Sequence, residues 1–365
     1  MNVMKEDAPK NLNKNNMTKE IYVAGNKTEY LNVLRVYACM AVIIFHIFAI
    51  IISAFGTTFS EIEKYICVLL RNIWLWHVPT FIMISGVIFL NKEKEITIKK
   101  LYLKYISRIV LALIIFGFPF AFMEIFYDNH YQFNIGQLGT SLLNVFQGNL
   151  WDHMWYLYMI TGLYILLPFF KIFANYSDRK TLEYVLIVLF VFTGVIPTFA
   201  SIFRLNFGIS IPLSSVFALY LLLGHYIHRY NVIINNKILY LTGLLYILYM
   251  AFVAINKDFV DARGDIVGLN GNISPLVVWL TVCVFCYVRQ HVPTNKVYDL
   301  ISPLTFGMYL IHPLIINLFI KVIKFTPDKY PLVVVVVVVA IVTTILSLLF
   351  TLVARKIKIV KKYIL

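Results

Sequence analysis

Long apolar runs separated by short polar segments recur along almost the whole chain. A helix needs about 20 apolar residues to cross a bilayer, and ten runs come close to that length, at 31–55, 72–90, 105–127, 153–173, 182–200, 211–229, 238–256, 273–289, 301–322 and 331–354. In lipid the backbone must satisfy its own hydrogen bonds, so such runs form helices. The pattern predicts an all-α, polytopic integral membrane protein with about ten transmembrane helices.

Composition agrees with this prediction and excludes an ordinary soluble protein. Of the 365 residues, 60% are hydrophobic and 14% are charged, whereas soluble domains have about 45–50% apolar and about 25% charged residues. The net charge of +14 would suggest a nucleic-acid partner in a soluble protein. Here most Lys and Arg fall in alternate loops, as the positive-inside rule requires. We therefore expect no nucleic acid, both termini in the cytoplasm and a multi-pass protein of the cell membrane, with the lipid bilayer as its partner.

The polar ends of the chain bracket a single membrane domain. We expect residues 1–29 to form a polar cytoplasmic tail, 30–356 the ten-helix domain and 357–365 a short basic cytoplasmic tail. The first apolar run is too long for the core of a signal peptide and has no small-residue cleavage site, so it is expected to remain as the first span. The chain ends soon after the tenth run, which suggests a stand-alone membrane domain.

The first run contains two ionisable residues that an ordinary membrane helix lacks. In "YLNVLRVYACMAVIIFHIFAIIISAF", Arg35 and His46 are eleven residues apart. Eleven residues make about three helical turns, so both side chains fall on one face, about 16 Å apart in depth. Taken alone, Arg35 could reach lipid phosphates and His46 could be satisfied by a neighbouring helix. Their shared face favours a functional site.

A second buried arginine is predicted at the depth of Arg35. Arg108 lies about one turn inside the third span, and Lys99, Lys100 and Lys104 precede it. The topology rule accounts for Lys99 and Lys100, but it accounts less well for the deeper Arg108. Two arginines and a lysine cluster at one level suit an anion with several phosphates.

Two further histidines lie beside prolines inside apolar runs. His77 precedes Pro79 near the outer end of the second span, and His312 precedes Pro313 near the middle of the ninth. A proline leaves a helix carbonyl without its usual donor, so His312 has an alternative, structural role as a donor to that carbonyl. Gly86, later in the second span, suits close helix packing.

Acidic and aromatic residues gather near the predicted outer side. Glu124 lies near the outer end of the third span, and Asp152, His153 and Trp155 lie at the start of the fourth. Between these spans "LGTSLLNVFQ" predicts a short amphipathic helix. Aromatic residues such as Trp155 are common at membrane interfaces without any further role. Together, a basic inner side, a deep histidine and an outer acidic mouth suit transfer from a phosphorylated cytoplasmic donor to an outer acceptor.

Five motifs in order along the chain resemble the membrane acyltransferase-3 family, the ten-helix enzymes that O-acetylate surface polysaccharides. They are the Arg-to-His segment "RVYACMAVIIFH", then "VPTFIMISGVIFL", the basic start of the third span, "HMWYLYMITGLYILLP" and "LTFGMYLIHP". Family members usually have two arginines three residues apart at the third motif. Here Arg108 matches the second of them and Tyr105 replaces the first.

The resemblance implies an acyltransferase that uses acetyl-CoA as the donor and a sugar hydroxyl of an envelope polysaccharide, or of its lipid-linked precursor, as the acceptor. His46 would be catalytic, either as a general base or as an acyl-histidine nucleophile, and Glu124 or another carboxylate would orient its imidazole. Donor or substrate contacts are expected from Arg35, Arg108, Lys104, Trp155, His77 and His312. No metal is expected, and a separate envelope protein or polysaccharide synthesis complex is a possible partner.

Two other functions use the same deep polar groups. A transporter or flippase of lipid-linked saccharides would need no acetyl-CoA, and inverted internal symmetry would favour it. A membrane anchor or receptor in an envelope assembly would not need the Arg35–His46 face at all.

Overall fold

The computed structural model describes residues 28–203, 205, 215–255 and 274–365, and within these ranges it is helical without strands. Six helical segments are long and apolar enough to cross a membrane, and they span Tyr30–Phe55, Glu61–Phe89, Ile98–Asp128, Arg179–Ala200, Lys296–Val322 and Leu332–Ala354. A seventh candidate is the pair Asp152–Ile165 and Leu167–Tyr176, bent by 54°. The all-α, multi-pass membrane protein is confirmed, whereas the count of ten spans and the side on which the termini lie stay predictions.

Each of the ten apolar runs contains a helix in the described residues. The helices within these runs are α2 (Tyr30–Phe55), α4 (His77–Phe89), α6 (Ser107–Asp128), α8 (Trp155–Ile165), α9 (Leu167–Tyr176), α10 (Arg179–Phe190), α11 (Ile196–Phe203), α12 (Val216–Arg229), α13 (Asn236–Ile255), α14 (Pro275–His291), α16 (Thr305–Asn317) and α17 (Leu332–Ala354). The connecting and terminal helices are α3 (Glu61–Asn72), α5 (Ile98–Lys100), α7 (Gly136–Gln147), α15 (Lys296–Ile301) and α18 (Lys358–Tyr363). Parts of the runs at 211–229, 238–256 and 273–289 lie outside the described residues.

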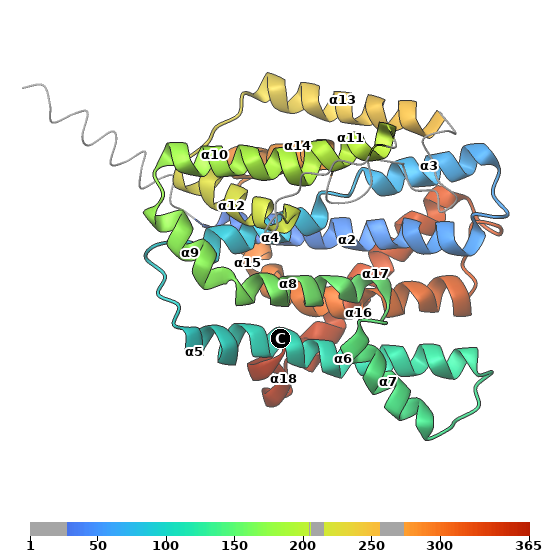
Figure 1. Ribbon diagram of the computed structural model, residues 1–365. Coiled ribbons are helices and arrows are strands. Elements are labelled where there is room, and N and C mark those ends of the chain that lie inside the picture. Colours follow the sequence, from blue (N-terminus) through green and yellow to red (C-terminus); the bar gives the residue numbers. More distant parts are fainter. Residues whose placement is uncertain (1–27, 204, 206–214, 256–273) are drawn as a thin grey trace, which may run out of the picture.

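The long helices run side by side in a bundle, with α2 near its centre (Figure 1). The first helix packs against α3, α4, α14, α16 and α17. The short helix α7 confirms the one expected from "LGTSLLNVFQ". Of the predicted terminal tails, residues 1–27 lie outside the described residues, while residues 358–363 form α18, which folds back onto α6.

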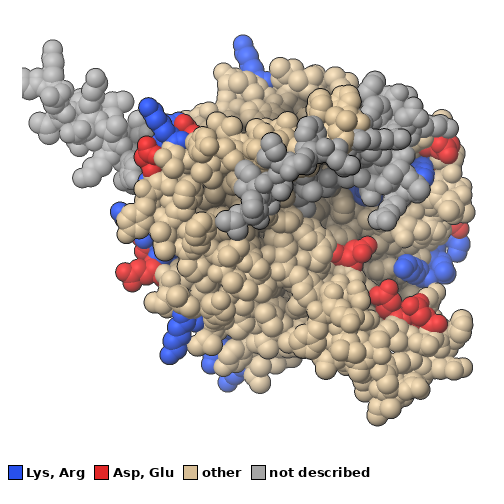
Figure 2. Space-filling model, viewed as in Figure 1, with Lys and Arg blue, Asp and Glu red and all other residues tan. Residues whose placement is uncertain are grey.

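The valine-rich helix α17 buries one narrow stripe. Its buried residues recur at every fourth position, at Val335, Val339, Thr343, Ser347 and Thr351. The large apolar side chains between them are exposed, which suits contact with lipid. Over the face drawn in Figure 2, most charged side chains lie towards the two ends of the bundle and an uncharged band crosses its middle. This distribution is typical of a protein that spans a membrane.

Two glycines bring α4 and α12 into backbone contact. A Cβ atom added at Gly86 would lie 1.9 Å from the carbonyl oxygen of Leu221, and one added at Gly224 would lie 2.1 Å from that of Met83. The close packing expected at Gly86 is therefore confirmed. This contact holds one face of α4 against α12. The opposite face of α4 packs towards α2 and α8.

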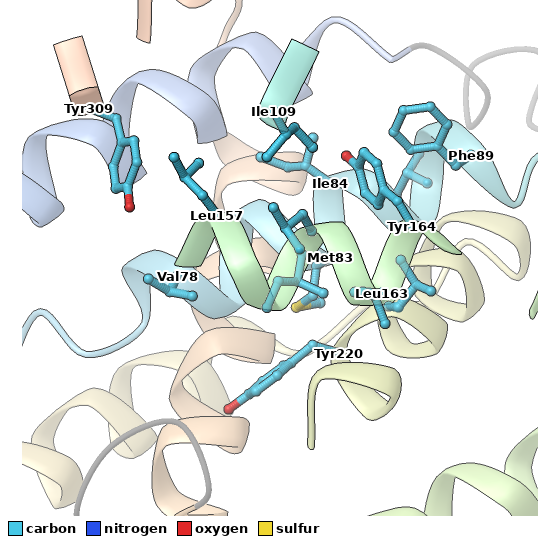
Figure 3. Packing of buried hydrophobic residues seen from close by; sticks show 14 of the residues in the cluster. Val78, Met83, Ile84, Phe89, Ile109, Leu157, Leu163, Tyr164, Tyr220 and Tyr309 are labelled. Atoms are coloured by element: carbon cyan, nitrogen blue, oxygen red, sulfur yellow. The ribbon is translucent and has the colours of Figure 1, made fainter. Parts of the chain in front are cut away.

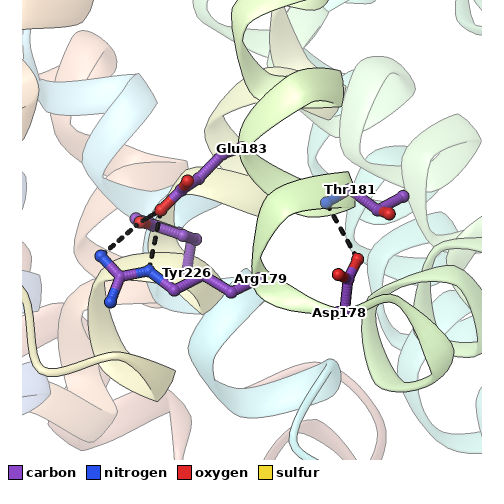
Figure 4. A network of polar contacts seen from close by, with 5 residues as sticks. All are labelled: Asp178, Arg179, Thr181, Glu183 and Tyr226. Carbon is purple, nitrogen blue, oxygen red and sulfur yellow. Dashed lines mark hydrogen bonds and ion pairs between the residues drawn. The ribbon is translucent and has the colours of Figure 1, made fainter.

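A polar network joins the start of α10 to α12 (Figure 4). Asp178 caps α10 by accepting a hydrogen bond from the backbone N–H of Thr181 at 3.0 Å. Arg179 and Glu183 form an ion pair one turn apart, at 2.8 Å, and the hydroxyl of Tyr226 on α12 donates to the same carboxylate. The network is exposed, so it orients the helix end more than it stabilises the fold.

The α4–α12 contact predicts that Gly224→Ala destabilises the protein. The new methyl group has no room against the backbone of α4, and overpacking of this kind typically costs about 1–3 kcal/mol. The measurement is the apparent unfolding temperature of the purified protein in detergent. Gly162→Ala is the matched control, because a Cβ atom there meets nothing within 4 Å. Equal unfolding temperatures for the two variants would contradict the prediction.

Candidate active site

A cavity of about 490 Å³ lies between α2, α4, α6, α8 and the start of α16. Basic side chains line one end, where Tyr105 lies beside Lys94, and aliphatic side chains and further tyrosines line the rest. The lining residues are Asn32, Arg35, Val42, Val78, Phe81, Ile84, Ser85, Ile88, Phe89, Lys94, Tyr105, Arg108, Ile109, Tyr156, Ile160, Tyr164, Ser302, Pro303, Thr305, Phe306 and Tyr309. Figure 3 shows Tyr309 and Phe89 at opposite ends of this part of the core, with Ile84, Ile109 and Tyr164 between them.

The two predicted arginines meet at the basic end of this cavity. Nη1 of Arg35 donates to Asn32 Oδ1 at 2.9 Å and to Ser302 Oγ at 3.4 Å. Nε of Arg108 donates to the carbonyl oxygen of Ile364 at 2.7 Å, next to the returning α18. Within the described ranges, neither guanidinium has a carboxylate at ion-pair distance. Two positive groups held in place without a counter-ion have the charge and hydrogen-bond donors that suit an anion.

Lys94 is a third cation at this end, and the sequence did not distinguish it from the other lysines of its loop. Its ammonium lies 4.4 Å from the ring centroid of Phe89 and 5.6 Å from that of Tyr105. Burial and, to a smaller extent, nearby positive charges together lower the pKa of Lys94 to about 8. These charges belong to Lys100, Lys171, Arg35 and Lys104. A bound anion would relieve that repulsion.

Four histidines from separate parts of the chain gather beyond the other end of the cavity. His46 comes from α2, His77 from α4, His312 from α16 and His153 from the 3₁₀ turn Asp152–Met154. The ring centroid of His46 lies 4.9 Å from that of His312, 6.4 Å from that of His153 and 6.5 Å from that of His77. In the part of the chain that the structure describes, no group of three side chains is arranged to hold a metal ion.

The cavity ends within one helical turn of these histidines. Val42 lines it and is one turn before His46 on α2, and Tyr309 lines it and is one turn before His312 on α16. The hydroxyl of Tyr309 also donates to the carbonyl oxygen of His153. The cavity therefore extends from the cations to the turns that precede His46 and His312, and none of the four histidines is among its lining residues.

Hydrogen bonds assign the proton of the His46 imidazole. Nδ1 of His46 lies 2.9 Å from the carbonyl oxygen of Val42 and 3.3 Å from Nε2 of His312. A carbonyl oxygen only accepts, so Nδ1 carries the hydrogen in the neutral ring and Nε2 carries a lone pair. His46 therefore has the tautomer that a base or nucleophile at Nε2 requires.

The remaining predicted residues are placed differently. Lys104 is exposed and is not among the residues that line the cavity. Its Nζ lies 5.8 Å from the ring centroid of Tyr105. Trp155 is 42% exposed and packs against Phe217. Glu124 is exposed near the end of α6, and no hydrogen bond joins it to His46 among the described residues. The roles of all three stay predictions without a contact to support them.

Several residues of the site carried too weak a signal in the sequence. In the sequence His153 is one of several polar groups at the outer side, but its ring is buried and its Nε2 has no hydrogen-bond partner among the described residues. The sequence also gives Tyr156 and Tyr309 no role beyond that of ordinary aromatic residues. Only the fold brings these three side chains next to one another.

Comparison with known proteins supplies the family. A family model described as an acyltransferase domain, that of the acyltransferase-3 family, matches residues 28–352. The chain therefore belongs to the acyltransferase-3 family, and the protein is a multi-pass membrane acyltransferase. No curated protein and no solved structure matches the chain.

The environment of Lys94 predicts that donor affinity falls as the pH rises above about 8. Below that pH Lys94 is charged and attracts a phosphate; above it the free protein must first take up a proton. We expect the Kd for a non-hydrolysable thioether analogue of acetyl-CoA to rise by up to about tenfold per pH unit above 8. Lys94→Met should bind more weakly with a flat profile.

The control for this titration is Lys100→Met, which removes a neighbouring lysine that does not line the cavity. It should keep the slope of the wild-type protein. An unchanged slope in Lys94→Met would contradict the assignment of this titration to Lys94.

Proposed function

We propose that the protein is an O-acyltransferase that takes an acetyl group from cytoplasmic acetyl-CoA and passes it to a sugar hydroxyl. The acceptor is an envelope or extracellular polysaccharide, or its lipid-linked precursor. Family membership supports the acyl transfer. One observation supports this donor above others: a cavity with largely apolar walls extends from a cluster of cations to Val42 and Tyr309, which lie one turn before His46 and His312.

The shape of the cavity matches the parts of acetyl-CoA. The phosphates would lie against Arg35, Lys94 and Arg108, where charge-assisted hydrogen bonds are strongest. The pantetheine arm would follow the aliphatic walls, and the acetyl group would reach the turn that precedes His46 and His312. The helical rise from Arg35 to His46 is about 16 Å, which the extended arm can span.

The chemistry proposed for His46 balances with one proton transfer in each direction. The acceptor hydroxyl oxygen attacks the thioester carbon while Nε2 of His46 takes the hydroxyl proton. The carbon–sulfur bond then breaks, and the imidazolium returns that proton to the departing thiolate. In a variant of the reaction, Nε2 attacks the thioester carbon, the carbon–sulfur bond breaks, and acetyl-histidine forms as the CoA thiolate leaves. The acceptor oxygen then attacks the acetyl carbon, the carbon–nitrogen bond breaks, and the hydroxyl proton neutralises the thiolate. Both routes need the lone pair that the hydrogen bonds leave on Nε2.

The proposal also fixes an orientation. The basic end of the cavity would face the cytoplasm, where acetyl-CoA is made. Both termini would lie on the cytoplasmic side of the cell membrane. The acidic and aromatic side chains around Asp152 would face outwards, where the acceptor or a separate envelope partner arrives. This arrangement would carry the acetyl group through the protein without moving the cofactor across the bilayer.

The proposal predicts that His46→Gln abolishes acetyl transfer while the protein still inserts and folds. Loss of a general base typically lowers the rate by about 10²–10⁴. The assay follows labelled acetyl transfer, or hydrolysis of acetyl-CoA, by purified protein in nanodiscs. His291→Gln is the matched control, because His291 is exposed and distant in sequence from every cavity residue of α2. Full activity in His46→Gln would refute the proposed function, and a transporter of saccharides would show no turnover of acetyl-CoA in either protein.

Arg35→Gln should chiefly weaken donor binding. Charge-assisted hydrogen bonds contribute about 1.5–3 kcal/mol, so the Kd of the thioether analogue should rise about tenfold to hundredfold. Arg179→Gln is the control, since Arg179 is an exposed arginine outside the cavity. Equal Kd values for the two variants would place the donor elsewhere.

A further inference from the structure

Pro313 leaves a backbone carbonyl free in the middle of α16. In a regular helix the N–H of residue 313 would donate to the carbonyl oxygen of Tyr309, but proline has no N–H. Nδ1 of His312 lies 2.6 Å from that oxygen. The ring of His312 thus takes the place of the missing backbone donor, and the structural role expected for a histidine beside this proline is present.

This bond decides what the other nitrogen of His312 can do. The carbonyl oxygen of Tyr309 only accepts, so the neutral ring carries its hydrogen on Nδ1 and a lone pair on Nε2. His312 is fully buried, and its Nε2 lies 3.3 Å from Nδ1 of His46. Between these two nitrogens His46 must be the donor. Both nitrogens of His312 are thereby engaged within the protein.

We propose that His312 is a positioning residue that keeps the proton of His46 on Nδ1 and so leaves Nε2 free for catalysis. The inference rests on the proposed function and deepens it. The opposite arrangement would have His312 donate from Nε2 to His46. It would remove the ring donor from the Tyr309 carbonyl and transfer the His46 hydrogen to Nε2, where it would block the base. Satisfying both carbonyls selects the active arrangement.

The same contacts favour the charged state that His46 passes through during the reaction. Once Nε2 has taken the hydroxyl proton, the imidazolium still donates from Nδ1 to the Val42 carbonyl and to the lone pair of His312. His312 keeps its own hydrogen throughout, because Tyr309 continues to hold it. The role of His312 is therefore to orient and stabilise the ring of His46, and no proton passes through it.

The first test is the tautomer of His46 in the wild-type protein. Protein with ¹⁵N-labelled histidine is placed in nanodiscs, and the His46 resonances are identified by their loss in His46→Gln. We expect a protonated Nδ1 and an unprotonated Nε2 at neutral pH. A hydrogen on Nε2 would overturn the proposal, and this result does not depend on any enzymatic activity.

The second test compares two substitutions at His312. Gln retains an acceptor near the position of Nε2, whereas Phe fills the space without one. His312→Phe should lower kcat on the order of tenfold to hundredfold with donor Kd unchanged, and His312→Gln should recover at least about half of that loss on a logarithmic scale. Equal and unimpaired kcat values in both variants would overturn the positioning role.

The proposed function and the positioning role of His312 can be refuted separately. If His46→Gln is inactive but both His312 variants match the wild type, the proposed function stands and the positioning role is refuted. If His46→Gln keeps full activity, the proposed function itself is refuted. Should His312→Phe fail to fold, the wild-type tautomer and the His312→Gln kinetics still decide the matter.

Discussion

An ionisable side chain inside an apolar helix bundle must find polar partners on its neighbours, and this constraint organises the centre of the molecule. The pairing of His46 with His312 links α2 to α16. One end of the same helix pair is linked by Arg35, which donates to Asn32 and to Ser302, the residue that opens the turn before α16. The two ends of the proposed donor site are thus held by contacts between the same two elements.

Close packing of α4 against α12 lies on the side of α4 that faces away from the cavity. The glycines at positions 86 and 224 let α4 and α12 touch through their backbones, so α4 is held on one side without large side chains. Its opposite face presents Val78, Phe81 and Ile84 to the cavity. Basic side chains line the end where the phosphates would lie, and Tyr156 and Tyr309 lie side by side near His312, where the acyl group would lie. A passage of this kind suits a ligand with a charged head and a long arm.

The sequence predicted the parts of the site that depend on spacing along one helix. The spacing of eleven residues from Arg35 to His46 places both on one face of the helix, and the proline after His312 predicts the carbonyl that holds it. The sequence did not predict which residues from different helices and loops come together by tertiary packing. His153 lies in a short turn, Lys94 in a lysine-rich loop, and neither has a pattern that predicts where it points. For Glu124 the sequence suggested a role in the site because of its charge, but in the structure its side chain is exposed. The apolar runs predicted where the helices lie. Among the described residues, however, only six helical segments are long and apolar enough to cross a membrane, and a bent pair of helices is a seventh candidate.

The central claim is that one cavity carries the donor from the cations to the histidine centre. Its most direct test is a structure of the protein in nanodiscs with the thioether analogue of acetyl-CoA bound. The account predicts phosphates in contact with Arg35 and Lys94, and an acyl carbon at the end of the cavity directed towards Nε2 of His46. Density for the analogue in another part of the molecule, or in this cavity with its acyl end among the cations, would contradict it.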